Sequence, residues 1–130
     1  MSKRDEHTFR FSAAQISEAT RAEAEYHEAR LEHWKERRDA SLERVEATIG
    51  AKVVRHLQSG GEVVDVVVDY GDPEAWREFQ LAERKISTHG RAAEEFRVDE
   101  RVCGSQGDRT YKLDVGDVQH FRLGGEPRED

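Results

Sequence analysis

Apolar side chains recur at helical spacing through residues 12–49, separated almost entirely by charged residues and alanine. The steps between the recurring positions are three or four residues and average 3.6, which is the period of the α-helix. No proline or glycine interrupts the stretch, and Ser12 suits the N-cap position. The pattern therefore predicts one long amphipathic helix. Its stripe, apolar at eight of eleven positions, comprises Ala13, Ile16, Thr20, Ala24, His27, Leu31, Trp34, Arg38, Leu42, Val45 and Ile49.

Such a helix would be about 57 Å long at ~1.5 Å per residue, whereas a compact globule of this chain length is only about 36 Å across. A stripe of that length cannot stay exposed to water. It requires a second long helix, supplied either by the same chain or by another copy. Trp34 is the bulkiest residue on the stripe and is the expected anchor of that contact.

The segment that follows, AKVVRHLQSGG at residues 51–61, supports two interpretations. Val53 and Leu57 continue the stripe, so the helix can run on and stop at the pair of glycines. Alternatively, residues 53–57 form a strand that turns through QSGG into the next segment. We favour the first interpretation, which gives a helix over residues 12–58.

Residues 62–70, EVVDVVVDY, form the clearest strand in the sequence, because five β-branched valines favour the extended backbone. Side chains alternate between the two faces of a strand. One face therefore carries Val64, Val66, Val68 and Tyr70. The other face is half polar and carries Val63, Asp65, Val67 and Asp69.

A second helix is predicted over residues 73–102, and it is the natural partner of the first within the chain. Asp72 is a strong N-cap, and Pro73 suits the first helical position. Trp76 and Phe79 begin an aromatic face on this helix, which we expect to lie against the stripe of the first helix.

Residues 110–123 alternate in polarity and predict a β-hairpin, which would join the strand at 62–70 in an antiparallel sheet of about three strands. The polar residues 124–130 predict a disordered tail. The expected fold is therefore α+β and mainly α. It is a single elongated helical domain over residues 1–123, with a small β element.

The net charge of the chain is −7, its pI is near 5.4, and 38% of its residues are charged. This acidic balance speaks against binding to nucleic acid or to an anionic membrane surface. No apolar run approaches the ~20 residues of a membrane span, and the N-terminus lacks the apolar core of a secretory signal. The lone cysteine, Cys103, cannot form an intramolecular disulfide and suits a reducing compartment. We therefore expect a cytoplasmic protein.

The sequence lacks the motifs of the common catalytic and cofactor sites. SGGE is not followed by the lysine of a phosphate-binding loop, and no G-x-S-x-G occurs. His27 and His33 would lie about 120° apart around a helix and ~9 Å apart along it, which prevents both from binding one metal ion. We expect no catalytic residue, metal ligand, cofactor or small-molecule substrate. The sequence leaves open whether His89, His120 and Asp117 meet in space.

These observations favour a non-catalytic structural or protein-interaction module, a coiled-coil-like accessory protein that self-associates or docks on another protein. The interface residues expected for this role lie along the stripe and on the second helix. They are Ile16, Leu31, Trp34, Leu42, Val45, Ile49, Trp76 and Phe79. The alternative is an acidic regulator or inhibitor. Residues 62–100 hold eleven acidic against five basic residues, a balance of −6, which would suit a basic partner such as a nucleic-acid-binding protein.

Overall fold

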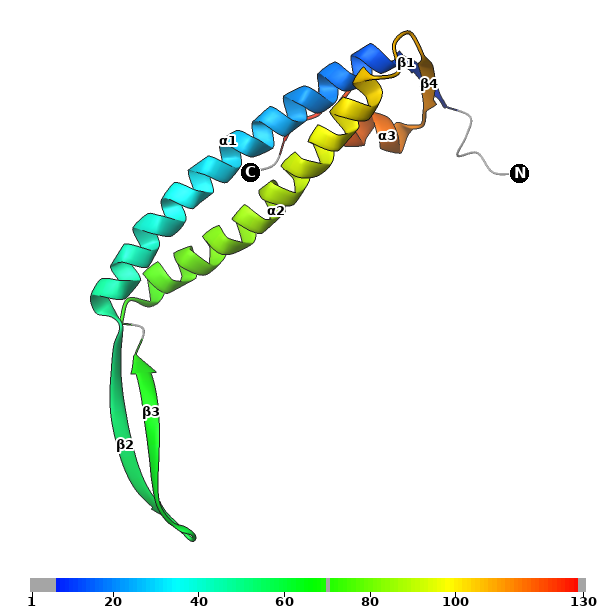
Figure 1. The fold of residues 1–130 in the computed structure, drawn as a ribbon. Helices are drawn as coiled ribbons and strands as arrows, with labels where there is room; N and C mark the ends of the chain where they lie inside the picture. The colour runs from blue at the N-terminus through cyan, green and yellow to red at the C-terminus, as the bar shows by residue number, and fades with distance from the viewer. Residues whose placement is uncertain (1–6, 70, 129–130) are drawn as a thin grey trace. The chain divides into compact units, whose positions relative to one another are not determined.

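The computed structural model describes residues 7–69 and 71–128, with the side chains of residues 51 and 52 excepted. The fold is α+β and mainly α, as predicted (Figure 1). The elements are, in order, β1 (Phe9–Ser12), α1 (Ala13–Thr48), β2 (Gly50–Gln58), β3 (Gly61–Asp69), α2 (Pro73–Gly104), β4 (Thr110–Leu113) and α3 (Val115–His120).

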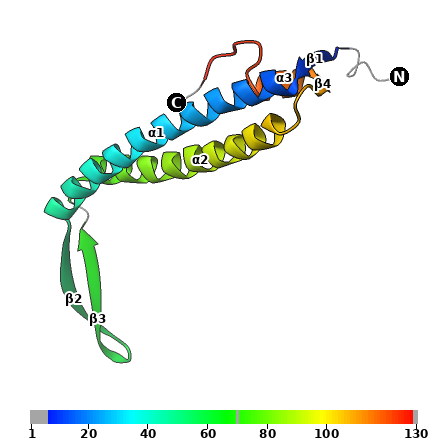
Figure 2. The same ribbon diagram turned by 45° about the horizontal axis from the view of Figure 1, so that its top comes forward.

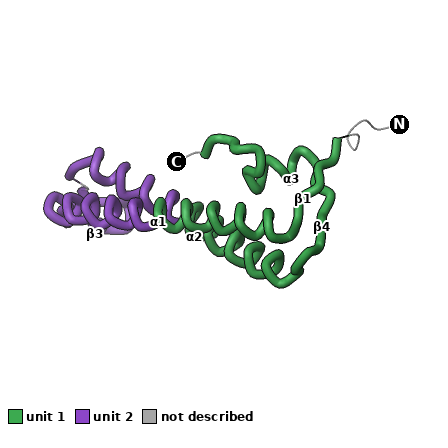
Figure 3. Tube along the Cα trace, turned by 90° about the horizontal axis from the view of Figure 1, so that it is seen from above, with its two compact units in different colours: residues 1–31, 87–130 green, residues 32–86 purple. Residues whose placement is uncertain are grey.

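The chain divides into two compact units, which Figure 3 distinguishes by colour. Unit 1 comprises residues 1–31 and 87–130, and unit 2 comprises residues 32–86. Each of the two long helices contributes one part to each unit. The second long helix that the α1 stripe requires is therefore supplied by the same chain.

Both long helices begin where the sequence predicts. The Gln15 N–H donates to Ser12 Oγ at 3.1 Å, and the Ser12 N–H donates to Gln15 Oε1 at 2.8 Å. This reciprocal pair satisfies two backbone donors at the start of α1. At the start of α2, the Ala75 N–H donates to Asp72 Oδ1 at 3.0 Å, and Pro73 occupies the first helical position.

Unit 1 packs the first part of α1 against the last part of α2. Three alanines of these helices, Ala13, Ala24 and Ala93, are buried, and side chains as small as these allow two helices to approach closely. Ile16 and Phe96 supply its larger apolar volume. Unit 1 also contains β1, β4 and α3.

The β-hairpin predicted over residues 110–123 is wrong. Strand β4 pairs antiparallel with β1, in a register that joins Phe9 to Leu113. The chain then enters α3, because Asp114 and Asp117 form a capping box. The Asp117 N–H donates to Asp114 Oδ1 at 2.8 Å, and the Asp114 N–H donates to Asp117 Oδ2 at 3.4 Å. The predicted three-stranded sheet is also wrong, because the described strands form two separate pairs, β1–β4 and β2–β3.

The chain after α3 runs back along α1 (Figure 2). The sequence predicts a disordered tail over residues 124–130, yet Arg128 forms an ion pair with Glu23 of α1, with Arg128 Nε 2.9 Å from Glu23 Oε1. Residues 129–130 lie outside the described part of the chain.

Unit 2 packs the second part of α1 against the first part of α2 and carries the β2–β3 pair. Among the residues of unit 2 whose side chains are described, the buried ones are Trp34, Ser41, Val45, Ala75 and Ala82.

The helix predicted to continue to residue 58 is wrong beyond Thr48, and the alternative interpretation as a hairpin is correct. Gly50 weakens a helix by ~1 kcal/mol, and the β-branched Val53 and Val54 favour a strand. The decisive factor is β3, which pairs antiparallel with β2 along its whole length, from Gly50↔Asp69 to Gln58↔Gly61. Extended pairing satisfies the backbone of residues 50–58 in a way that an isolated end of a helix cannot.

Candidate functional site

The β2–β3 pair, called the ribbon below, has one face that is largely apolar. Val53 lies directly opposite Val66, so the two side chains share a face, and side chains two residues apart on each strand share it too. We call its apolar part the valine face. It comprises Val53, Leu57, Val64, Val66 and Val68, and two charged side chains, Arg55 and Glu62, lie on the same face. Tyr70, which the sequence also assigns to this face, lies outside the described residues.

The valine face is exposed to solvent. Its side chains range from 46% exposed at Val68 to 84% at Leu57, with Val66 at 65%. Single apolar residues on a surface are ordinary, but a contiguous apolar patch marks a contact with another molecule. A two-stranded ribbon is also only marginally stable by itself in water. The valine face is therefore the feature of unit 2 that most requires a partner.

The opposite face of the ribbon is mixed in character. Val54 and Val67 are exposed on it, and His56 Nε2 lies 3.5 Å from Asp65 Oδ2. Asp69 adds a second carboxylate at the far end of β3. This confirms the half-polar face that the alternation of residues 62–70 predicts, and it leaves the valine face as the more hydrophobic side.

The two strands of the ribbon carry opposite charges. β2 contains basic residues and no acidic one, whereas β3 contains three acidic residues and no basic one. Among the described residues each strand pairs only with the other, so both outer edges of the ribbon are open (Figure 1). An open edge presents unpaired backbone N–H and C=O groups that can extend a sheet.

The predicted interface residues lie mostly within the chain's own helix contacts. Ile16, Trp34 and Val45 are buried, at 3%, 6% and 2% exposure. The half-buried members are Leu31, Leu42, Trp76 and Phe79. Ile49, which follows α1, is the exposed exception at 44%. The stripe was correctly identified as a packing surface, but what covers it is α2, and the exposed apolar surface lies on β2 and β3.

Two neighbouring side chains show how α2 covers the stripe. In unit 1, the Leu31 Cδ1 lies 3.9 Å from the position that a β-carbon would take at Gly90, so α2 approaches α1 closely there. In unit 2, the Lys85 ammonium of α2 lies 5.9 Å from the centroid of the Trp34 ring, and the Arg37 guanidinium of α1 itself lies 5.2 Å from it. These cations protect the indole from water.

Unit 1 contains a cluster of aromatic rings and histidines. His27 Nδ1 and His89 Nδ1 are 2.8 Å apart, and the His27 ring stacks on Phe96 at 5.7 Å. Phe96 in turn stacks on His120, with ring centroids 5.2 Å apart, so that His27 and Phe96 lie between His89 and His120 in this chain of contacts. Asp117 is held in the capping box of α3. Within the described residues no group of three histidine, cysteine or acidic side chains could hold a metal ion.

Next to this cluster, the carboxylate of Glu23 is almost completely buried, at 1% exposure. Arg128 Nε and Arg122 Nε lie 2.9 and 3.4 Å from its oxygens, and His27 Nε2 lies 4.0 Å away. Burial lowers the pKa of His27, Glu23 acts against that change, and the two arginines add to it. The carboxylate thus ties the C-terminal segment to α1. A substrate would have to displace two arginines to reach it.

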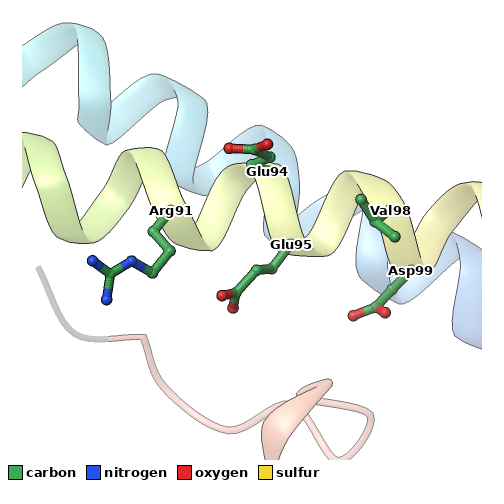
Figure 4. A pocket seen from close by; sticks show the side chains of 5 residues that line it. All are labelled: Arg91, Glu94, Glu95, Val98 and Asp99. Carbon is green, nitrogen blue, oxygen red and sulfur yellow. The ribbon is translucent and has the colours of Figure 1, made fainter.

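An open hollow on α2 is lined by charged side chains and one valine. Its side chains all come from α2 (Figure 4), and they are Arg91, Glu94, Glu95, Val98 and Asp99. Burial raises the pKa of Asp99, but no nucleophile lines the hollow. Cys103 lies outside it and is half-buried. Burial raises the pKa of the Cys103 thiol, with a further contribution from Asp99, so the thiol is less reactive than an exposed one.

Comparison of the chain with protein-family models, with curated proteins and with solved structures gave no match. None of the helices in the described part of the chain is long and apolar enough to cross a membrane.

Proposed function

We propose that the chain is a non-catalytic protein-interaction module that self-associates through its β2–β3 ribbon, so that a second copy covers the valine face. The observation that carries the proposal is the exposure of that face, from 46% at Val68 to 84% at Leu57. No comparable surface is left along the described part of the α1 stripe, where α2 already covers the large side chains.

A second copy is a suitable partner for the valine face because it presents an identical apolar face. Valine side chains are stiff and β-branched, and two such faces interdigitate at the ~10 Å spacing of packed sheets. Covering the face would also stabilise a ribbon that is marginal as two strands. The charges of the two strands complement each other as well, which favours another copy of this chain over a partner of one sign.

The buried polar groups of unit 1 support a structural role for the rest of the molecule. Glu23 is neutralised by Arg122 and Arg128, and His27 is in contact with His89 and Phe96. We assign no catalytic step to any of them.

We do not extend the proposal to an acidic regulator. The acidic residues of the range 62–100 are divided between the two units. Several of their carboxylates are already paired within the chain. Arg44 binds Asp72 at 3.0 Å and Glu78 at 3.1 Å, and Arg21 binds Glu100 at 2.7 Å. These pairs reduce the charge that could attract a basic partner.

Sedimentation velocity over a range of protein concentrations tests the proposal. The double variant Val53→Thr/Val66→Thr changes a cross-strand pair on the valine face and keeps the branched shape that favours a strand. The matched control is Val54→Thr/Val67→Thr, on the opposite face. We expect the wild type and the control to associate and the valine-face variant to associate at least tenfold more weakly, about 1.4 kcal/mol. A wild type that stays monomeric, or equal association of both variants, would overturn the proposal.

A further inference from the structure

The charge distribution of the ribbon specifies more than the presence of a second copy. We infer that copies join head to tail, with the β2 edge of one copy pairing with the β3 edge of the next. This inference rests on the self-association proposed above and adds a second contact between copies, along the strand edges, to the contact between valine faces. It follows from the two open edges and from the segregation of basic residues on β2 and acidic residues on β3.

The charged side chains of the ribbon remain available to a neighbouring strand. Within the chain, Arg55 Nη1 lies 3.8 Å from Glu62 Oε1, but the two side chains are still 71% and 53% exposed. His56 and Asp65 form the other cross-strand pair, with side chains that are 38% and 58% exposed. Exposed pairs of this kind contribute little within one molecule. Each charge can therefore interact with a second strand on its free side.

The two symmetric alternatives place like charges against each other. A β3 edge against another β3 edge brings together two strands that hold three acidic residues each and no basic one. A β2 edge against another β2 edge brings together basic strands that contain no acidic residue. Like charges on opposed strands are destabilising, whereas opposite charges stabilise the pair. Only the β2-to-β3 seam matches a basic strand with an acidic one.

Strand direction is compatible with this seam. β2 and β3 are antiparallel within the chain, so a β3 edge followed by the β2 edge of a copy in the same orientation is again antiparallel. The repeated copies also place their valine faces on one side of the extended sheet, where the valine faces of a second such sheet can cover them. Because the contact is heterologous, repetition either closes into a ring or continues as an open chain.

Charge reversal at one cross-strand pair tests the inference. The Arg55→Glu variant makes the β2 edge acidic there, and the Glu62→Arg variant makes the β3 edge basic there. Each variant alone would then place like charges at every seam. We expect about tenfold weaker self-association of each, measured by sedimentation velocity at low salt, where exposed charges are least screened.

Mixing the two variants gives the decisive measurement. In an equimolar mixture, the acidic β2 edge of one variant meets the basic β3 edge of the other, and the remaining seams are native. We expect the mixture to recover wild-type association, although each chain still carries its own mismatched pair. The double variant Arg55→Glu/Glu62→Arg, which restores both kinds of pair in one chain, should associate like the wild type and controls for damage to the ribbon.

The outcomes separate the inference from the proposal on which it rests. A monomeric wild type overturns both. A wild type that associates, while the mixture stays as weak as its components, overturns the head-to-tail order and leaves self-association intact. An Arg55→Glu variant that associates as strongly as the wild type would overturn the β2-to-β3 seam and leave self-association intact. Circular dichroism of each variant checks that the strands are retained.

Discussion

Trp34 should be the most costly single side chain to remove from unit 2. It lies on α1 at 6% exposure, with the Arg37 guanidinium 5.2 Å from its ring centroid. Truncation of a buried tryptophan to alanine costs about 3–5 kcal/mol, because it removes apolar contact and leaves a cavity. We expect Trp34→Ala to lose this amount, because a helix contact of two rigid helices collapses only partly into such a space.

That loss is large compared with the whole stability of the chain. At roughly 0.05–0.15 kcal/mol per residue, a chain of this length has a free energy of unfolding of about 6–20 kcal/mol. At roughly 4 °C per kcal/mol for a domain of this size, the midpoint of thermal unfolding should fall by about 12–20 °C. The variant should still fold at room temperature.

Guanidinium unfolding followed by far-UV circular dichroism measures the loss, and hydrogen exchange locates it. Faster exchange should be concentrated in residues 32–86, the unit that contains Trp34. The control is Glu36→Ala, an exposed position on the same helix, which should change the stability by no more than about 0.5 kcal/mol. A Trp34→Ala loss below about 1 kcal/mol would refute the assignment of Trp34 to the helix contact.

Three further changes test the other contacts. Burial lowers the pKa of His27, so the unfolded chain binds its proton more readily. Stability should therefore fall as the pH drops below about 6.5, and His27→Gln should flatten this slope in urea unfolding. Glu23→Gln should cost about 3 kcal/mol, because it leaves two arginines without their buried carboxylate, and trypsin should cut the C-terminal segment faster. Gly71 has a φ of +69°, and its missing β-carbon would clash with the carbonyl oxygen of Thr48. Gly71→Ala should lower the free energy of unfolding by more than about 1 kcal/mol, measured by thermal unfolding. Gly60→Ala should lower it far less, because a β-carbon at Gly60 would meet no atom within 4 Å.

The parts of the fold that the sequence predicts correctly are those governed by local physics. The α1 stripe depends on the 3.6-residue period, and the positions Ala13, Thr20 and Ala24 along it are fully buried. The two helix starts depend on Ser12 and Asp72, each of which accepts a hydrogen bond from a backbone N–H three residues later. Period and capping both act over a few residues, so a single sequence contains them.

The incorrect predictions involve contacts between distant residues. The spacing of Val53 and Leu57 fits one turn of a helix as well as one face of a strand. Only the pairing of this segment with β3 makes it a strand. β4 pairs with β1, at the other end of the chain, which no local pattern reveals. The one local signal that was missed is the capping box of Asp114 and Asp117, which predicts a helix at the place where a returning strand was expected.

The sequence could not locate the exposed apolar surface for a related reason. An apolar stripe indicates a surface that needs cover, but not which molecule provides the cover. Along α1 the cover is α2 of the same chain, so Ile16 and Val45 are buried without a partner. The alternation of residues 62–70 correctly defined the two faces of β3. It could not show that the more apolar of these faces would remain exposed.

The distribution of valine gives a physical reason to expect that this face is covered in the assembled protein. Four of the twelve valines of the chain lie on the valine face, and three more lie on the opposite face of the ribbon. If their role were only to hold the strands extended, threonine would serve as well, because it has the same branched shape and a hydroxyl that water can solvate. Valine is preferable only where its methyl groups leave water. The Val53→Thr/Val66→Thr variant therefore separates the two roles: the ribbon should persist, and the association should weaken at least tenfold.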